Sequence, residues 1–149
     1  MAAAFLDTSA LLRRYDRSEP GAARVRQFCV PSRGHDLLLA RITSVEIASA
    51  IGRKVREGTW SVSEGNRAWK LFRVHWRDQY QVAALTDQVY AEAERLLFQY
   101  ALRAFDAVHV ASALLLAPRV PQGALQFWTA DRRQAAAARS AGLMVELVS

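Results

Sequence analysis

Residues 102–117, LRAFDAVHVASALLLA, place one carboxylate, Asp106, and one imidazole, His109, inside an almost unbroken apolar run. A helix this apolar is normally buried, and an isolated buried carboxylate is unfavourable unless it is neutralised or meets positive charge. Its neighbours Phe105 and Ala107 offer it nothing polar. Asp106 is therefore a candidate for chemistry, as an acid that keeps its proton or as a ligand of a cation.

Three other acids stand where predicted strands end or helices begin. Asp7 ends the first strand, Glu46 lies in the first turn of the helix after the second strand, and Asp131 follows the strand LQFWT. Ligands of open α/β sheets bind beyond the carboxyl ends of the strands, so we expect these acids and Asp106 to meet at that edge. Hydroxyl groups at the same edge could orient the carboxylates or bound waters: Thr8, Ser9 and Thr129.

Taken singly, each acid also has a purely structural interpretation. Asp7, in DTS, suits a turn or a helix cap, and Glu46 completes a T-x-x-E capping box with Thr43. Asp131 complements the dipole of the helix that it starts. Asp106 could be a buried acid with hydrogen bonds to nearby backbone or hydroxyl groups.

Taken together, the acids favour a cation. Two carboxylates ~4 Å apart repel each other by about 4 kcal/mol at an effective dielectric constant near 20, so a cluster must hold protons or bind a positive ion. The one Cys and three His are too scattered for a zinc site, and oxygen ligands favour Mg²⁺ or Mn²⁺. Such ions activate water and neutralise charge on a phosphodiester, which indicates nucleic-acid hydrolysis.

Composition is compatible with that chemistry. The 149 residues, 52% of them hydrophobic, suit one domain over residues 1–149. The net charge is +6, with 18 Arg against 2 Lys, which indicates either a polyanionic partner or a genomic bias toward Arg; charge alone does not decide between them. The sequence has no long apolar span, no secretion signal and a lone Cys29, so we expect a cytoplasmic protein without a membrane segment.

The elements that must position these acids alternate between strand and helix. Strands are predicted at 3–7, 36–40, 81–85, 125–129 and 144–148, and helices at about 9–15, 21–30, 43–57, 86–100, 103–116 and 131–141, with a further helix from 61 that carries Trp69, Phe72 and Trp76. Expected helix ends are a cap at Thr43 or Ser44, a capping box at 61–64, a cap at Thr86, and glycines at 58 and 142. This alternation predicts a three-layer α/β/α sandwich with a central, mostly parallel sheet.

Four stretches together resemble a known family. FLDTSALL, ITSVEIASAIGRK, LRAFDAVHVASALLLA and FWTADRRQAAAARSAGL are similar, in order and spacing, to the acidic motifs of PIN-domain ribonucleases, above all the single-domain VapC-type toxins. The third stretch is the most specific, and the likeness extends from Asp7 to the final strand. The resemblance implies a Mg²⁺- or Mn²⁺-dependent endoribonuclease with a PIN-like fold, usually a homodimer, held inactive by a cognate antitoxin.

By position, the resemblance implies that Asp7, Glu46, Asp106 and Asp131 are the catalytic and metal-binding acids. The fourth position is more variable in the family and often acts through water. Thr8 and Thr129 match auxiliary hydroxyl positions. Gln134 departs from the pattern, which has an apolar residue there, and this departure concerns helix packing more than chemistry.

The remaining polar and aromatic residues have competing interpretations. His109 lies on nearly the same helix face as Asp106, and we interpret it as a packed histidine with a satisfied hydrogen bond, outside the catalytic set. Trp69 and Trp76 are interpreted as core or dimer contacts, whereas Trp60 lies in a loop-like segment. The basic residues nearest the acids are candidate RNA contacts, with solvated surface as the alternative: Arg13, Arg14, Arg132 and Arg133.

Two other functions remain as alternatives. A phosphoacceptor receiver domain needs paired acids at the first strand end and a lysine near the last strand, whereas Asp7 stands alone and both lysines fall in predicted helices. A non-catalytic PIN-like RNA-binding or scaffold protein would have lost metal binding. Presence of all four acids favours the enzyme.

Overall fold

The computed structural model describes residues 2–121 and 124–149. Its strands are β1 (Ala3–Leu6), β2 (Asp36–Ala40), β3 (Tyr80–Ala83), β4 (Leu125–Thr129) and β5 (Met144–Leu147). Its α-helices are α1 (Thr8–Tyr15), α2 (Ala22–Cys29), α3 (Thr43–Arg56), α4 (Val62–Asp78), α5 (Asp87–Gln99), α6 (Ala104–Leu116) and α7 (Arg132–Ser140), and two 3₁₀ turns are η1 (Pro31–Arg33) and η2 (Ala117–Arg119).

The strands form one sheet in the order β3-β2-β1-β4-β5, and every pairing is parallel. The central strand β1 is buried along its whole length, and it pairs Phe5 with Phe127 and Leu6 with Trp128 of β4. A strand buried on both faces reads as a continuous apolar run, which explains why AAFL lacks the polar alternation of a half-exposed strand.

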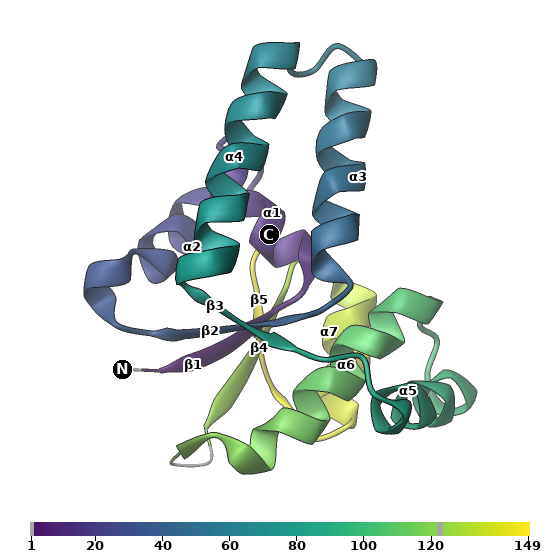
Figure 1. The fold of residues 1–149 in the computed structure, drawn as a ribbon. Coiled ribbons are helices and arrows are strands. Elements are labelled where there is room, and N and C mark those ends of the chain that lie inside the picture. Colours follow the sequence, from purple (N-terminus) through teal and green to yellow (C-terminus); the bar gives the residue numbers. More distant parts are fainter. Residues whose placement is uncertain (1, 122–123) are drawn as a thin grey trace.

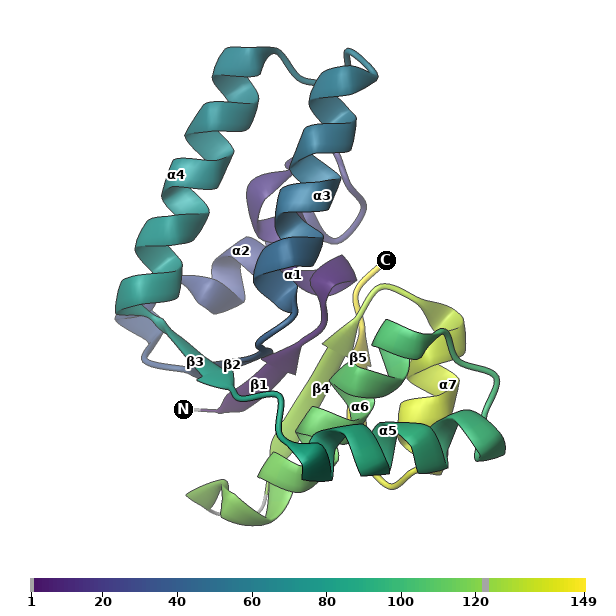
Figure 2. The same ribbon diagram turned by 45° about the vertical axis from the view of Figure 1, so that its right-hand side comes forward.

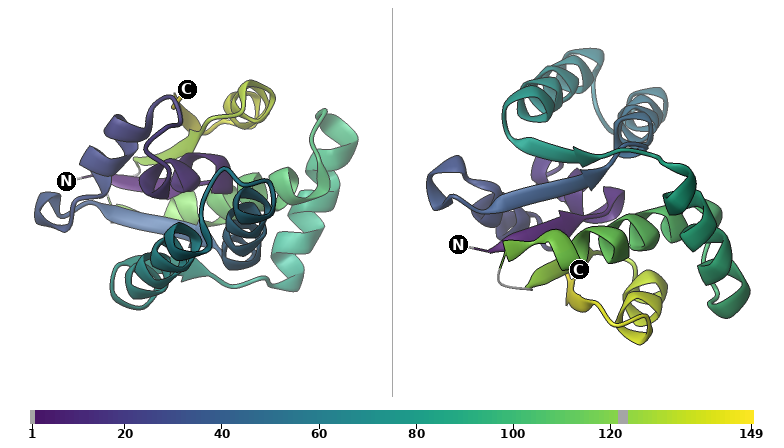
Figure 3. Two further views of the ribbon diagram at one scale, coloured as in Figure 1. Left: turned by 90° about the horizontal axis from the view of Figure 1, so that it is seen from above. Right: turned by 60° about the horizontal axis from the view of Figure 1, so that its bottom comes forward.

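Side-chain alternation along the strands builds one core on each face of the sheet. Leu6 and Trp128 point to a core shared with α1–α4, and Phe5 and Phe127 point to a core shared with α5–α7. Figure 1 shows α1–α4 above the sheet and α5–α7 below it, and both views of Figure 3 show the same three layers. The predicted α/β/α sandwich with a parallel sheet is confirmed.

The chain changes face between two neighbouring strands. The helix after β1 lies in the layer of α1–α4, whereas the helix after β4 lies in the layer of α5–α7. Because adjacent strands then send their helices in opposite directions, a crevice opens beyond their carboxyl ends, where α/β proteins bind ligands. Asp7 follows β1 at this point, and Asp131 follows β4.

Most predicted helix ends are confirmed, and one is wrong. Ser61 and Glu64 form the complete capping box of α4, the side chain of Thr86 caps α5, and Gly58 and Gly142 take positive φ angles after α3 and α7. The cap expected at Thr43 or Ser44 is absent: α3 begins at Thr43 with Ile42 in the N-cap position and no side-chain cap bond. Burial prevails over capping here, because Thr43 faces the interior, where its hydroxyl finds no partner among the described residues.

Helices α3 and α4 form a hairpin that extends away from the sheet, as Figure 2 shows. Phe72 of α4 is fully buried, and Trp69 and Trp76 pack beside it against the core, as expected for core contacts. No described helix is by itself long and apolar enough to cross a membrane; residues 87–99 and 104–119 would reach that length and composition only as a pair bent by 119°.

Candidate active site

Asp7 occupies the centre of the crevice. It is 2% exposed and serves as the N-cap of α1, with Oδ1 accepting from the Ala10 amide (2.8 Å) and the Ser9 hydroxyl (2.7 Å). Oδ2 accepts from the hydroxyl of Thr129, at the end of β4, at 2.5 Å. Burial raises the pKa of Asp7, and His109 and these hydrogen bonds oppose the rise only in part. Asp7 is thus both a helix cap and a buried acid that a cation would stabilise.

Glu46 reaches the crevice from the first turn of α3 and plays no part in a capping box. Its Oε1 accepts from the hydroxyl of Thr8 at 2.7 Å and lies 2.6 Å from Nε2 of His109. Burial alone would raise the pKa of Glu46, but the hydrogen bond and charge of His109 and the bond from Thr8 outweigh burial, and the pKa is lowered. Glu46 is therefore a carboxylate tied to two partners far away in the chain.

Asp106 and Asp131 face each other across the start of α6 and the start of α7. Burial raises the pKa of Asp106, and the charge of Asp131 raises it further, while His109 opposes the rise. Asp131 is the N-cap of α7, with Oδ1 accepting from the amides of Arg133 (2.8 Å) and Gln134 (3.2 Å), so the helix-start interpretation is correct. Both amides use the same oxygen, which leaves Oδ2 of Asp131 for another ligand.

His109 was underweighted by the sequence. It is 1% exposed, and its charge lowers the pKa of Asp7, Glu46 and Asp106 alike, which places the ring among all three acids. The expected satisfied hydrogen bond exists only at Nε2, because Nδ1 has no partner in the described part of the chain. The spacing of three residues from Asp106 was the signal in the sequence, but it could not reveal contacts with α1 and α3.

Gln134 confirms the packing interpretation of its departure from the family pattern. The side chain is 2% exposed and its Nε2 donates to the carbonyl oxygen of Asp106 at 3.3 Å. This bond joins α7 to the first turn of α6. Gln134 therefore helps to hold the helices that carry Asp106 and Asp131 together.

The acids fit a hydrated ion of the magnesium type better than a closed metal site. Within residues 2–121 and 124–149, no three His, Cys, Asp or Glu side chains are grouped closely enough to ligate one ion directly. Mg²⁺, however, commonly keeps several waters and needs only one or two carboxylates. The raised pKa values of Asp7 and Asp106, and the repulsion between Asp106 and Asp131, show negative charge that a cation would relieve.

The candidate RNA-binding arginines fall into two groups. Arg132 and Arg133 are exposed in the first turn of α7, beside Asp131. Arg13 instead donates to the backbone of Pro20 and Ser9, and Arg14 donates to the Tyr80 hydroxyl at 2.8 Å and to a backbone carbonyl. Arg13 and Arg14 are thus engaged within the fold, at the end of α1 away from Asp7.

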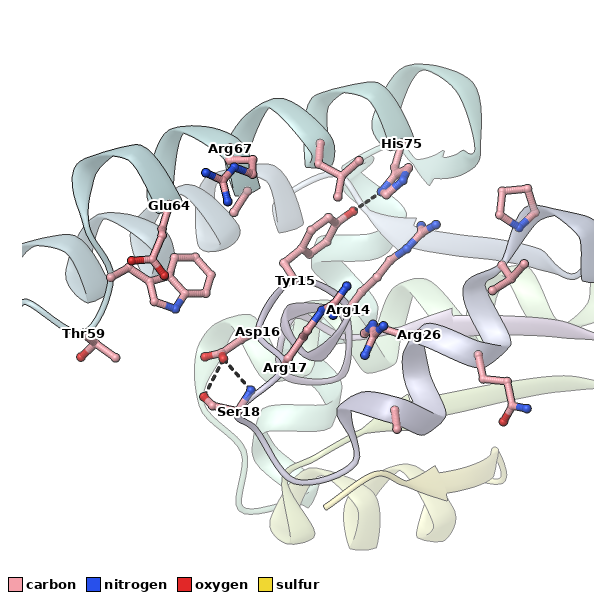
Figure 4. A pocket seen from close by; sticks show the side chains of 17 residues that line it. Arg14, Tyr15, Asp16, Arg17, Ser18, Arg26, Thr59, Glu64, Arg67 and His75 are labelled. Carbon is pink, nitrogen blue, oxygen red and sulfur yellow. Dashed lines mark hydrogen bonds between the residues drawn. The ribbon is translucent and has the colours of Figure 1, made fainter.

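A second hollow lies at that far end of α1. It is a pocket of about 1200 Å³ between the α1–α2 segment and α4, drawn in Figure 4. Four arginines line it, namely Arg14, Arg17, Arg26 and Arg67. Its two acids are already engaged, Asp16 by Lys54 at 2.5 Å and Glu64 in the capping box, and burial together with Arg14 lowers the pKa of His75 to about 4. The pocket therefore carries net positive charge.

Comparison with known proteins gives a family match and several structural likenesses. Residues 4–140 match the PIN domain. The fold is similar to VapBC2 from Rickettsia felis, solved bound to a promoter DNA fragment (8% identity, 99% of each chain covered, TM-score 0.66). It is also similar to Mycobacterium tuberculosis VapC20, a toxin that cleaves the sarcin–ricin loop (14% identity, 95% of this chain and 96% of that chain, TM-score 0.64), and to FitAcB from Neisseria gonorrhoeae (14% identity, 95% of each chain, TM-score 0.60).

No curated protein matches the sequence. At identities this low the solved structures establish the fold and nothing more about chemistry. The family match is of another kind, because it covers nearly the whole chain, including β1, β4 and the three elements that carry Asp7, Glu46 and Asp106. With its parallel sheet and its acids at the crevice between β1 and β4, the chain belongs to the PIN-domain family.

Proposed function

We propose that this protein is a metal-dependent endoribonuclease and the toxin of a toxin–antitoxin pair. The observation that carries the proposal is the convergence of Asp7, Glu46 and Asp106, from three separate elements, around the buried ring of His109. A fold gains no stability from gathering like charges in a buried crevice, so the arrangement is best explained by a bound cation.

Asp7, Asp106, Glu46 and Asp131 would hold Mg²⁺ or Mn²⁺, directly or through its waters. When bound, such an ion lowers the pKa of a coordinated water and neutralises charge on the phosphodiester. The hydroxyls of Ser9 and Thr129 hold Asp7 in one orientation by donating to its two oxygens. Glu46 is held by Thr8 in the same way.

We further propose that Arg132 and Arg133 contact the RNA backbone beside the acids. Both are exposed, and they follow Asp131 directly. Arginine forks suit phosphate oxygens, and each contact of this kind makes binding more sensitive to salt. Arg13 and Arg14 would contribute to RNA binding only by giving up their bonds within the fold.

Cleavage of total RNA with and without EDTA, with the cut ends mapped, tests the enzyme. We expect wild-type protein to cut internal phosphodiester bonds with Mn²⁺ or Mg²⁺, EDTA to stop it, and Asp106→Asn to be inactive yet folded. Folded Asp106→Asn protein with full activity would contradict the proposal. Calorimetry with Mn²⁺ separates the enzyme from a non-catalytic PIN-like RNA-binding or scaffold protein, because the absence of binding in the millimolar range would favour the scaffold.

For the antitoxin, we propose that an acidic segment with apolar anchors docks in the arginine-lined pocket. The charge of Arg17, Arg26 and Arg67 is complementary to acidic side chains, and Trp60 and Leu71 offer apolar surface in the same pocket. Charge complementarity of this kind mainly speeds association and selects the partner. The neighbours that were solved as toxin–antitoxin complexes support the existence of such a partner.

The product of the small reading frame beside this gene is the probe for that docking site. Arg17→Glu and Arg67→Glu should each weaken its binding at least tenfold, whereas Arg119→Glu, in η2 and outside the pocket, should not. Equal binding by all three variants would place the antitoxin elsewhere. The homodimer implied by the resemblance stays a prediction, which sedimentation velocity of the isolated chain tests.

A further inference from the structure

The ring of His109 joins three elements that are far apart in the chain. His109 belongs to α6, and its Nε2 lies 2.6 Å from Oε1 of Glu46, on α3. The hydroxyl of Thr8, on α1, donates to the same Oε1 at 2.7 Å and stands 3.3 Å from Nε2. These three side chains form one triangle, in which both partners contact a single oxygen of Glu46.

The direction of the hydrogen bonds follows from the chemistry of a carboxylate. An ionised carboxylate only accepts, so Nε2 of His109 must be the nitrogen that carries the proton toward Glu46. Two donors on Oε1 leave Oε2 as the oxygen that can face a ligand. The ring itself is held by burial and by an edge-on contact with Phe5, at 6.4 Å between centroids.

Glu46 needs such support because its own helix provides little at that end. It stands in the first turn of α3, where no side chain caps the helix, and its side chain is 24% exposed. The α3–α4 hairpin then leads away from the sheet (Figure 2). A glutamate side chain with free rotamers loses about 1.5–2 kcal/mol of conformational entropy when a ligand orders it, and a preformed clamp removes part of that cost.

We infer that His109 is a positioning residue for the active site: with Thr8 it clamps Oε1 of Glu46, so that Oε2 is presented to the cation and its waters. This inference rests on the proposed function. It assigns His109 no contact with RNA and no proton transfer in the reaction. Groups that orient a metal's carboxylates in this way typically contribute 10- to 100-fold to affinity or activity.

Three variants at this position separate positioning from packing. His109→Gln can return an N–H to the place of Nε2, His109→Leu fills the space with no donor, and His109→Asn puts its donor nearer the backbone. Ser112→Ala is the matched control, because Ser112 is equally buried on α6 but donates only to the carbonyl of Val108 in its own helix.

The first readout is Mn²⁺ affinity by calorimetry, without RNA, on proteins whose folding is checked by circular dichroism. We expect His109→Leu and His109→Asn to bind Mn²⁺ about 10- to 100-fold more weakly, and His109→Gln and Ser112→Ala to stay within about threefold of wild type. In cleavage assays kcat should fall while KM for RNA stays unchanged. If the leucine variant does not fold, the asparagine and glutamine variants carry the comparison.

A double-mutant cycle with Glu46→Gln tests whether His109 acts through Glu46. Removal of the donor at position 109 should have almost no further effect on Mn²⁺ affinity once Glu46 has lost its charge, because residues that act as one unit are not additive. Additive losses, or a leucine variant with wild-type affinity and kcat, would overturn the inference. Wild-type protein that binds no Mn²⁺ and cuts no RNA would instead overturn the proposed function, so the two failures are distinguishable.

Discussion

Replacement of Asp7 by Asn should reverse the order of stability between wild type and variant when metal is added. In metal-free protein Asp7 is 2% exposed and its pKa is raised because burial disfavours the charge. Asn keeps an oxygen for the Ala10 amide and the Ser9 hydroxyl. The Thr129 hydroxyl, which now donates to Oδ2, can turn and accept from the new amide. In EDTA we therefore expect Asp7→Asn to unfold at the same temperature as wild type or higher.

Metal should stabilise only the protein that binds it. At a Mn²⁺ concentration of 100 times Kd, binding to the native state adds about 2.7 kcal/mol to the free energy of unfolding. For a domain of this length each kcal/mol raises Tm by about 2–4 °C, so wild type should gain about 5–10 °C. Asp7→Asn, with its central ligand removed, should gain almost nothing. Mn²⁺ should thus make wild type the more stable of the two.

Differential scanning calorimetry of both proteins, in EDTA and across a Mn²⁺ series, measures these four states. A matched control is Asp36→Asn, an exposed acid at the start of β2, which should respond to Mn²⁺ as wild type does. The reasoning fails if Asp7→Asn is clearly less stable than wild type in EDTA, because Asp7 would then be a structural cap whose charge the fold needs. It also fails if both proteins gain equally from Mn²⁺.

The pH dependence in EDTA gives an independent check on the same residue. A carboxyl group with a raised pKa contributes stability that is fully present below its unfolded-state pKa of 3.8 and is lost as pH rises through its folded-state value. Asn has no such titration. The free energy of unfolding of wild type minus that of Asp7→Asn should therefore fall between acid and neutral pH. A difference that increases with pH would show that the charged form of Asp7 is the favoured one.

Three further predictions concern the scaffold, and urea unfolding measures each. Ser61→Ala removes the cap bond to the Glu64 amide, so we expect a loss of about 1 kcal/mol, and an unchanged midpoint would mean that the capping box is not formed in solution. Phe72→Ala empties a fully buried site at the base of the hairpin and should cost about 3–5 kcal/mol; a cost below 1 would contradict the packing. Gly21→Ala forces a Cβ to 3.1 Å from the backbone of Val148 at a φ of 82°, so it should cost about 1–2 kcal/mol or more, and a stabilised variant would show a different turn.

The sequence alone determined the layers of this protein and the edge where its chemistry lies. Apolar runs separated by helical periods predicted each strand within one or two residues, because a strand buried on both faces must be apolar throughout. The order of acids after strands then predicted the positions of Asp7 and Asp131 at the crevice, since parallel strands present their carboxyl ends at one edge. The capping box at 61–64 was readable for the same reason: its bonds span three residues.

Contacts between distant elements were decided by the tertiary structure alone. Glu46 completes a local capping pattern in the sequence, but in the fold its carboxylate bonds to Thr8, 38 positions away, and to His109, 63 positions away. No periodicity encodes such pairs, because they depend on how α1, α3 and α6 pack on opposite faces of one sheet. The same packing turned Thr43 inward, away from the cap role that its sequence suggested, and put an imidazole where only carboxylates were expected.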